Sequence, residues 1–488
     1  MGEAELPERW TSASEILQRI RRGECSAVEV TSDAVERIHA LNPVYGAATF
    51  LSEEEAVSAA TALDQRLARC EPVGSLAGIP TLMKDLYGFR PGWPTTLGGL
   101  PAALEDSAPD GVWSRYPLQV LRHDGILIGQ TNSSTFGFRG VTDNTCFGPT
   151  RNPFDAGRNA GGSSGGSAAA VGPGMVPIAG ASDAGGSIRI PAAWTNTFGF
   201  QASAGRVPSS PRPSLFHLGP HLYEGAVTRT VEDGLLAFNA LQGFDPHDPY
   251  STPESPISSR VLTAGVVGKR MGLSLDFGGF PVEPSIADRI ERAAETFESL
   301  GAIVEPVTLN LSHPHDELTQ MWLRAMGTLM AADVDGFAAR GLSPDELGAP
   351  EAVLQWVGVA RRMACGEIVR DRVVRTTVLD CFIEATEHFD LLLGPTVTSM
   401  PVSNRTDGET AGPTTIEGHA VDPLIGWCPT YLTNFTGFPS ASVPTGLVDG
   451  LPVGMLIVGK KFHDASVFAA AAAFEEARPW FGNYSLVG

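Results

Sequence analysis

Two glycine-rich serine clusters and one lysine are the residues of this sequence that could do chemistry. The first cluster reads Gly-Gly-Ser-Ser-Gly-Gly-Ser from Gly161 and contains Ser163; the second reads Gly-Gly-Ser from Gly185 and ends at Ser187. Glycine tolerates positive φ angles and close backbone approach, so such runs are typical of loops whose N–H groups face a ligand. Lys84 lies upstream in Met-Lys-Asp-Leu, and the three positions together predict a site.

A serine hydroxyl becomes a strong nucleophile only when a nearby base removes its proton. None of the ten histidines is close in sequence to either cluster. Those in two proline- and glycine-rich loops are not favoured as bases: His217, His221, His313 and His315. A lysine can serve instead if burial lowers its pKa enough to leave a neutral amine. Lys84 closes the apolar run 79–83, which predicts a side chain drawn into the protein.

The residues before Ser187 could supply the second requirement of acyl transfer, which is a set of N–H donors for a developing oxyanion. Ala184, Gly185, Gly186 and Ser187 can turn successive N–H groups toward one point. A phosphate-binding loop is the competing interpretation of the first cluster. That cluster lacks the Gly-Lys-Ser/Thr ending of such a loop, because Gly166 is followed by Ser167.

Composition disfavours several classes of partner. The 488 residues are 43% hydrophobic and 18% charged, as in a globular protein with a large core. A formal charge of −21 without a basic run disfavours binding to nucleic acid or to an anionic membrane. The predicted partner is a small molecule, and a homodimer is a further possibility.

Cysteine usage and hydropathy predict a cytoplasmic protein. No window reaches the ~18 apolar residues of a membrane span, and no secretion signal is expected from the first 23 residues. The cysteines contain no Cys-x-x-Cys pair, so we expect neither a disulfide framework nor a metal site. They are Cys25, Cys70, Cys146, Cys365, Cys381 and Cys428.

Strand and helix patterns alternate along most of the chain, which indicates an α/β fold with a buried sheet. The spacing of apolar residues predicts a helix over 285–300. Ser26-x-x-Glu29 is a capping-box pattern that predicts a helix start, and Asn42-Pro43 predicts the end of that helix. Short apolar runs predict buried strands at 79–83, 125–130, 176–179, 390–394 and 454–459.

These motifs resemble the amidase signature family, the hydrolases with a Ser–cis-Ser–Lys triad. The resemblance rests on the Lys84 motif, both serine clusters, Asp183-Ala-Gly-Gly-Ser-Ile-Arg-Ile-Pro191 and Thr436-Gly-Phe-Pro near the C-terminus. It implies a large, mixed, mostly parallel sheet between layers of helices and no cofactor. We expect residues 1–76 to form an N-terminal helical layer on a body of residues 77–488. A variable helical and loop region at about 308–425 would lie over the site.

The resemblance also implies a role for each site residue. Lys84 would be the base, Ser163 the bridging serine after a cis Gly162–Ser163 bond, and Ser187 the nucleophile. The N–H groups of residues 184–187 would form the oxyanion hole. Supporting positions would be Gly162, Ser164, Asp183 and Arg189, the last two as an ion pair. The predicted activity is cleavage of aryl or alkyl amides, with an apolar pocket that includes Trp194, Phe198, Trp322, Trp356 and Cys428.

Two alternatives stay open. The chain could be the A subunit of a tRNA-dependent amidotransferase, which uses the same core to release ammonia from glutamine. It could also be a non-catalytic binding protein on this fold. Departures from the family pattern, such as Gln130-Thr-Asn132 and Gly199-Phe-Gln-Ala-Ser203, lie outside the three catalytic positions and indicate a divergent branch.

Overall fold

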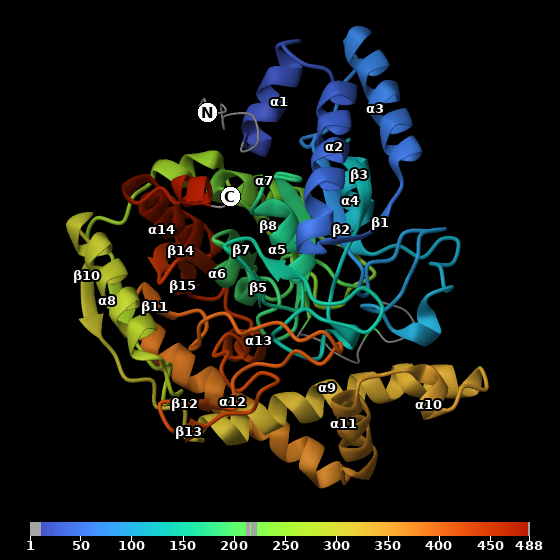
Figure 1. The fold of residues 1–488 in the computed structure, drawn as a ribbon. Coiled ribbons are helices and arrows are strands. Elements are labelled where there is room, and N and C mark those ends of the chain that lie inside the picture. Colours follow the sequence, from blue (N-terminus) through green and yellow to red (C-terminus); the bar gives the residue numbers. More distant parts are fainter. Residues whose placement is uncertain (1–10, 211–214, 216–221, 487–488) are drawn as a thin grey trace.

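An eleven-stranded sheet forms the centre of the protein and helices surround it (Figure 1). This computed structural model describes residues 11–210, 215 and 222–486. The strands in spatial order are β1 (Ala48–Leu51), β3 (Ile126–Thr131), β2 (Pro80–Lys84), β6 (Ile178–Asp183), β8 (Tyr223–Thr228), β7 (Phe198–Gln201), β14 (Ser440–Val448), β15 (Leu451–Gly459), β11 (Leu391–Pro395), β9 (Arg270–Leu273) and β10 (Ile303–Pro306). Two small ribbons lie outside it: β4 (Arg151–Asn152) with β5 (Asp155–Asn159), and β12 (Thr415–Ile416) with β13 (His419–Ala420).

The sheet is mixed, as predicted, but the expectation that it is mostly parallel is wrong. Within the described strands, β3–β2, β2–β6, β11–β9 and β9–β10 pair in parallel, and the other neighbours pair antiparallel. Part of the reason is local turn chemistry. Asp449 and Gly450, both at positive φ, join β14 to β15, and such a two-residue turn returns the chain antiparallel.

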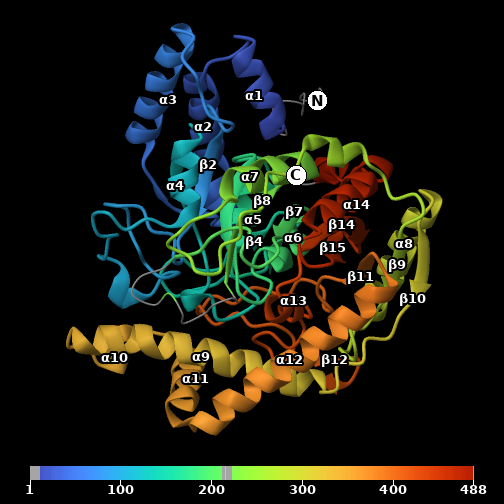
Figure 2. The ribbon, with the colours of Figure 1, turned by 180° about the vertical axis from the view of Figure 1, so that it is seen from behind.

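Helices cover both faces of the sheet and extend beyond its edges. Their bounds are α1 (Ala13–Arg21), α2 (Ala27–Tyr45), α3 (Glu53–Ala68), α4 (Arg115–Arg122), α5 (Gly165–Val171), α6 (Arg189–Thr195), α7 (Val231–Leu241), α8 (Pro284–Ser299), α9 (His315–Ala339), α10 (Pro344–Leu347), α11 (Glu351–Arg362), α12 (Cys365–His388), α13 (Tyr431–Thr436) and α14 (Asp464–Ala477). Figures 1 and 2 show α1–α3 at one end of the molecule and α9–α12 at the opposite end. None of the described helices is long and apolar enough to span a membrane.

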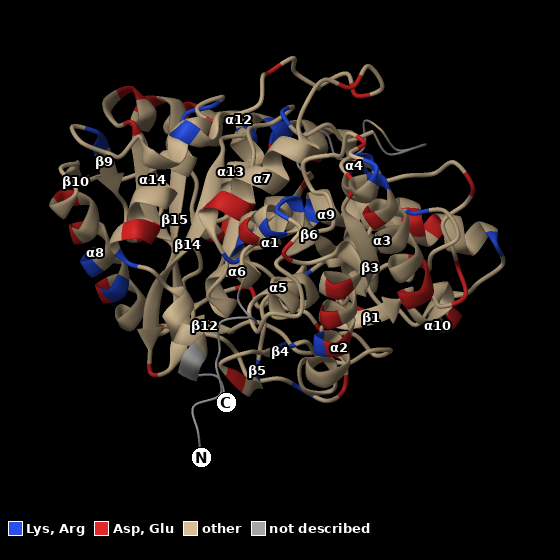
Figure 3. Ribbon diagram, turned by 90° about the horizontal axis from the view of Figure 1, so that it is seen from above, with Lys and Arg blue, Asp and Glu red and all other residues tan. Residues whose placement is uncertain are grey.

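The distribution of charged residues along the chain indicates which elements form the core. Strands β3, β14 and β15 contain no charged residue, and Figure 3 shows the charged residues mainly on the surrounding helices and loops. Burial on both faces requires such apolar strands. The long helices α9 and α12 and the short helix α13 share one hydrophobic cluster with residues of α6.

The N-terminal segment is more closely integrated than a separate helical layer would be. Its strand β1 pairs with β3 at the edge of the sheet, and its helices share a hydrophobic cluster with β2, β3 and β6. The predicted capping box at Ser26 and Glu29 is confirmed, but α2 continues through Pro43 to Tyr45 and ends at Gly46 in the left-handed conformation. Proline in the last turn removes only one helical hydrogen bond. The division at residue 76 stays our proposal.

Candidate active site

Lys84 is the last residue of β2, and its side chain is buried next to the first serine cluster. Its Nζ lies 2.7 Å from Ser163 Oγ and 3.1 Å from Ser182 Oγ. Burial lowers the pKa of Lys84 to about 7, although the carboxylate of Asp183 acts in the opposite direction. Because an amine with this pKa is substantially neutral at pH 7, Lys84 can act as a base.

The two serine clusters meet through their backbones. The Gly162–Ser163 peptide bond is cis, and Ser164, the next residue, donates its N–H to the Ser187 carbonyl at 3.2 Å. Helix geometry would normally direct the residue four positions after Ser187 to that carbonyl, but this residue is Pro191 and has no N–H. The proline therefore leaves the Ser187 carbonyl available to the other cluster.

Asp183 and Arg189 form a buried ion pair beneath the loop that contains Ser187. Arg189 donates from Nε and Nη2 to the two carboxylate oxygens of Asp183, each at 2.9 Å, and neither side chain has exposed surface. Burial alone would raise the pKa of Asp183, but Arg189 and Asn434 outweigh this effect and hold the pKa below its usual value. The carboxylate stays charged, and its N–H partners include those of Gly186 and Ile188.

This pairing changes the predicted oxyanion hole. The Gly186 N–H donates to Asp183 Oδ1 at 2.6 Å, so it is not available to a substrate oxygen in this structure. The N–H groups of Ala184, Gly185 and Ser187 have no acceptor within the part of the chain that the structure describes. We therefore assign the proposed oxyanion hole to these three residues and correct the inclusion of Gly186.

Arg189 also connects the loop to the C-terminal part of the chain. Its Nη1 donates to the Thr430 carbonyl at 3.0 Å, to Ser440 Oγ at 3.1 Å and to Thr433 Oγ1, and its Nη2 donates to Asn434 Oδ1 at 2.7 Å. Together with the two carboxylate oxygens of Asp183, six buried acceptor atoms surround one guanidinium group. The ion pair predicted from the sequence is a network between α6 and the α13 region.

Breaking this network should destabilise the protein strongly. The substitution Arg189→Met leaves the carboxylate of Asp183 buried without its cation, which costs about 3–5 kcal/mol in comparable sites. We expect a loss of that size in the free energy of unfolding, measured by urea denaturation at pH 7. Arg324→Met is the matched control, because the Arg324–Asp371 pair is partly solvent-exposed and its loss should cost less. Equal losses in both variants would contradict the prediction.

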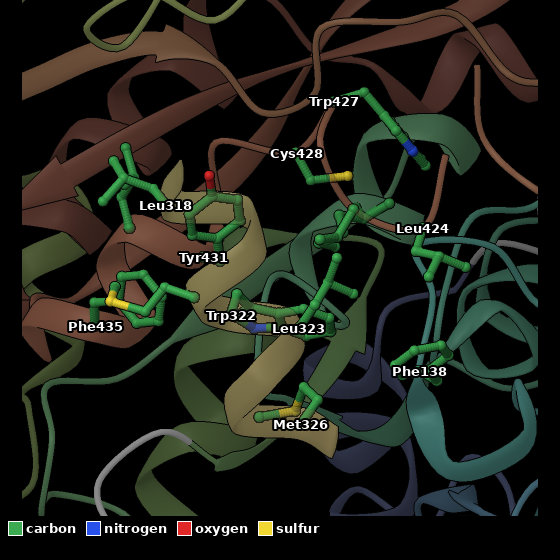
Figure 4. Packing of buried hydrophobic residues seen from close by; sticks show 14 of the residues in the cluster. Phe138, Leu318, Trp322, Leu323, Met326, Leu424, Trp427, Cys428, Tyr431 and Phe435 are labelled. Atoms are coloured by element: carbon green, nitrogen blue, oxygen red, sulfur yellow. The ribbon is translucent and has the colours of Figure 1, made fainter. Parts of the chain in front are cut away.

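The predicted pocket residues fall into two groups. Trp194, Trp322, Trp356 and Cys428 belong to one hydrophobic cluster. Figure 4 shows Trp322 in the middle of this cluster, between Tyr431 and Phe138. Phe198 lies in a different cluster with α7 and α14, so we do not retain it as a pocket residue.

The four tryptophan and cysteine positions differ in their surroundings. Trp194 stacks on Trp427 with ring centroids 4.8 Å apart, and its indole donates to the Ser399 carbonyl. Cys428 has no exposed surface, and burial raises its pKa well above the usual range. Trp322 contacts the loop of residues 184–187, which we call the nucleophile loop because it contains the proposed nucleophile Ser187. Its Nε1 donates to the Ala184 carbonyl at 2.9 Å. A role for these residues as pocket walls stays a prediction.

Three site residues were not identified from the sequence. Ser182 contacts Lys84, Thr430 Oγ1 donates to the Gly185 carbonyl at 2.7 Å, and Asn434 Nδ2 donates to the carboxylate of Asp183 at 2.9 Å. The signal for Ser182 in the sequence is its closeness to the second cluster. Thr430 and Asn434 stand just before the Thr436-Gly-Phe-Pro motif, but nothing in their spacing indicates which residues they meet.

The alternative bases and a metal site find no support in the described residues. His313 Nδ1 lies 3.0 Å from Glu317 Oε2, and the ring of His315 packs beside that of Phe280. His217 and His221 lie outside the described residues. No group of His, Cys, Asp and Glu in the described ranges could hold a metal ion.

Comparison with known proteins identifies the relatives of this chain. A family model described as Amidase matches residues 29–468. A solved bacterial aryl acylamidase of the amidase signature family is 49% identical, with 98% of both chains covered and a TM-score of 0.96. An acylamidase of Rhodococcus erythropolis is 31% identical over 96% of both chains. The A subunit of the glutamyl-tRNA(Gln) amidotransferase of Lactiplantibacillus plantarum is 32% identical over 95% of both chains.

The match to the family model covers most of the chain, and the buried lysine beside two linked serine clusters agrees with it. The chain therefore belongs to the amidase signature family of enzymes that hydrolyse amide C–N bonds.

Proposed function

We propose that the protein hydrolyses amides in two steps through a Ser187 acyl-enzyme. Neutral Lys84 takes a proton from Ser163 while Ser163 takes one from Ser187, whose oxygen attacks the amide carbonyl. The oxyanion accepts hydrogen bonds from the nucleophile loop. The relay then runs in reverse, and the leaving amine of the substrate receives the proton as the C–N bond breaks. Water then attacks the ester by the same relay and releases the carboxylic acid.

The observation that carries this proposal is the contact between Lys84 Nζ and Ser163 Oγ at 2.7 Å in a buried site. The amine has no carboxylate within hydrogen-bond distance among the described residues; its partners are serine oxygens. A lysine kept for structural reasons would be expected to have an acidic partner, because a buried unpaired charge is costly. The geometry favours an amine that exchanges protons with a hydroxyl.

Aryl and alkyl amides are the proposed substrates. Trp322 contacts the loop of residues 184–187 and belongs to one apolar cluster with Phe138 and Met326 (Figure 4). Apolar walls favour apolar acyl or amine groups. The relative with 49% identity, an aryl acylamidase, supports the same class. Phenyl or alkyl groups would gain from burial here, whereas small charged amides would lose hydration.

The amidotransferase A subunit is the second candidate, because relatives of that name share about a third of the residues across the chain. The solved A subunit is 25% identical with a TM-score of 0.73, below the values for the aryl acylamidase. The two functions differ in substrate and in partners. Glutaminase activity that rises on adding the other amidotransferase subunits would favour the second candidate. A cytoplasmic location and a homodimer stay predictions.

The proposed function can be tested with one labelling experiment and one substrate panel. A fluorophosphonate probe should modify the purified protein, and peptide mass spectrometry should place the adduct on Ser187. Acetanilide, hexanamide, glutamine and amino-acid amides should then be compared by kcat/KM. Labelling at another residue, or no labelling, would refute the nucleophile. Preference for glutamine would refute the proposed substrate class.

Activity should rise with pH through about 7. The neutral form of Lys84 is the base, and its pKa is about 7, so kcat/KM should fall as the pH drops below that value and level off above it. Burial also raises the pKa of the neighbouring Asp85 to about 7, despite hydrogen bonds from Thr96 that act the other way. The variant Asp85→Asn separates the two groups. We expect Asp85→Asn to retain the rise of kcat/KM near pH 7. Loss of this rise in Asp85→Asn would contradict its assignment to Lys84.

A further inference from the structure

Every carbonyl group of the nucleophile loop is held by a hydrogen bond. Thr430 Oγ1 donates to the Gly185 carbonyl at 2.7 Å, the Ile190 N–H donates to the Gly186 carbonyl at 2.7 Å, and the Ser164 N–H donates to the Ser187 carbonyl at 3.2 Å. The remaining carbonyl, that of Ala184, accepts from Trp322 Nε1 at 2.9 Å. Of these four donors, Trp322 alone comes from the long helix α9.

The direction of a carbonyl fixes the direction of the N–H in the same peptide unit. In a planar trans peptide the two groups point to opposite sides, and the only cis bond in the described residues is Gly162–Ser163. Because the Ala184 carbonyl points to the indole of Trp322, the Gly185 N–H points away from it. That N–H has no acceptor among the residues described, which is the condition of a donor kept for a substrate oxygen.

The indole also fits closely against the loop. A methyl group on Gly185 would lie 2.7 Å from Cε2 and Nε1 of Trp322, closer than real contacts allow, so the absence of a side chain at residue 185 permits this approach. Trp322 is 2% exposed, and its indole has one donor only. A buried indole N–H without an acceptor is costly, and this one has the Ala184 carbonyl as its partner.

Helix α9 is fixed on both sides of Trp322. The hydroxyl of Tyr431 lies 3.1 Å from Thr319 Oγ1, and the hydroxyl of Tyr87 donates to Asp333 Oδ2 at 2.7 Å. Tyr87 follows Lys84 by three residues, and Tyr431 follows Thr430 directly. The helix is therefore tied to the segments that carry the base and the loop support, and the indole has a defined position.

We propose that Trp322 is a positioning residue that aims the Gly185 N–H into the oxyanion hole. This role rests on the proposed function, and it differs from that of a pocket wall because it acts on the transition state. A wall residue binds the substrate before and during the reaction. An aimed N–H contributes mainly when negative charge develops on the substrate oxygen.

The test is the substitution Trp322→Phe, which removes the N–H and keeps an aromatic ring. We expect kcat on acetanilide to fall about tenfold to a hundredfold, less than the loss of a whole oxyanion-hole donor, with KM changed less than threefold. The inhibition constant of phenylboronic acid should rise by a similar factor. Its boron bonds to the Ser187 oxygen as the serine proton passes to the base, and a boron-bound oxygen then occupies the oxyanion hole.

Trp480→Phe is the matched control. The Trp480 indole donates to the Arg229 carbonyl at 2.8 Å and is equally buried, but it belongs to a different hydrophobic cluster. We expect it to lose stability without a comparable change in kcat. If Trp322→Phe fails to fold, replacement of Trp322 by 3-benzothienylalanine keeps the ring size and removes only the N–H.

Two results would overturn the inference: a raised KM with kcat unchanged, which indicates a pocket wall, or an equal loss of kcat in Trp480→Phe. A wild-type enzyme that neither hydrolyses amides nor binds phenylboronic acid would instead refute the proposed function, and this inference with it.

Discussion

Replacing Ser187 with alanine should abolish amide turnover, with a loss of about 10⁴-fold or more in kcat. No other group in the proposed mechanism forms the acyl-enzyme, and removal of a serine nucleophile from a comparable triad costs up to about 10⁶-fold. The loop should keep its shape, because the hydrogen bonds that hold its four carbonyl groups do not involve the Ser187 hydroxyl. The measurement is single-turnover and steady-state hydrolysis of acetanilide.

A matched control shows whether the loss comes from chemistry. Ser299 lies near the exposed end of α8, where its hydroxyl donates to the Glu295 carbonyl of the same helix. Ser299→Ala makes the same chemical change on the surface and should retain wild-type activity. Fluorophosphonate labelling should disappear in Ser187→Ala and persist in Ser299→Ala. Near-normal turnover by Ser187→Ala would refute the mechanism.

Lys84→Met should reduce kcat by about 10³-fold, because the relay loses its base while the apolar length of the side chain is kept. Ser163 would retain the hydrogen bonds that its carbonyl accepts from Ser133 and Thr142, but its hydroxyl would have no acceptor for its proton. Part of the activity should return at high pH, where hydroxide can remove the proton. A variant with the wild-type rate at pH 8 would exclude lysine as the base.

The same substitution should not destabilise the protein at acidic pH. The pKa of Lys84 falls to about 7 on folding, so folding is opposed fully below pH 7 and progressively less as the pH rises toward 10.5. Lys84→Met removes this cost. Its free energy of unfolding should therefore exceed that of the wild type most at pH 6, with a difference that narrows at pH 9. A variant less stable than wild type at pH 6 would contradict this sign.

Much of the fold follows from local patterns in the sequence. The apolar runs at 79–83, 125–130 and 454–459 are β2, β3 and β15, and the helix predicted over 285–300 is α8. The directions of neighbouring strands could not be predicted from these patterns, because a strand buried on both faces has the same apolar pattern with parallel and antiparallel neighbours. The end predicted for α2 at Asn42-Pro43 is too early, since a proline in the last turn is tolerated and the helix continues to Tyr45.

Some residues of the candidate site could likewise be predicted from the sequence, and others could not. Lys84, Ser163 and Ser187 could be selected because glycine and serine clusters and a lysine after an apolar strand are unusual in themselves. The occupied Gly186 N–H could not be foreseen, because the carboxylate of Asp183 competes for the donor. Thr430 and Trp322 contact the loop from more than 130 positions away in sequence. Such contacts depend on the tertiary fold, and no local pattern encodes them.

The buried guanidinium of Arg189 has a consequence for the timing of activity. Its partners Thr430, Asn434 and Ser440 follow it by 241 to 251 positions in the chain. A growing polypeptide that has passed residue 187 but has not reached residue 430 contains the lysine and both serine clusters, but it lacks the acceptors that Arg189 has between residues 430 and 440. Contacts this distant in sequence form only after long loops have closed. We therefore expect an unfinished chain to lack the ordered loop that the proposed hydrolysis requires.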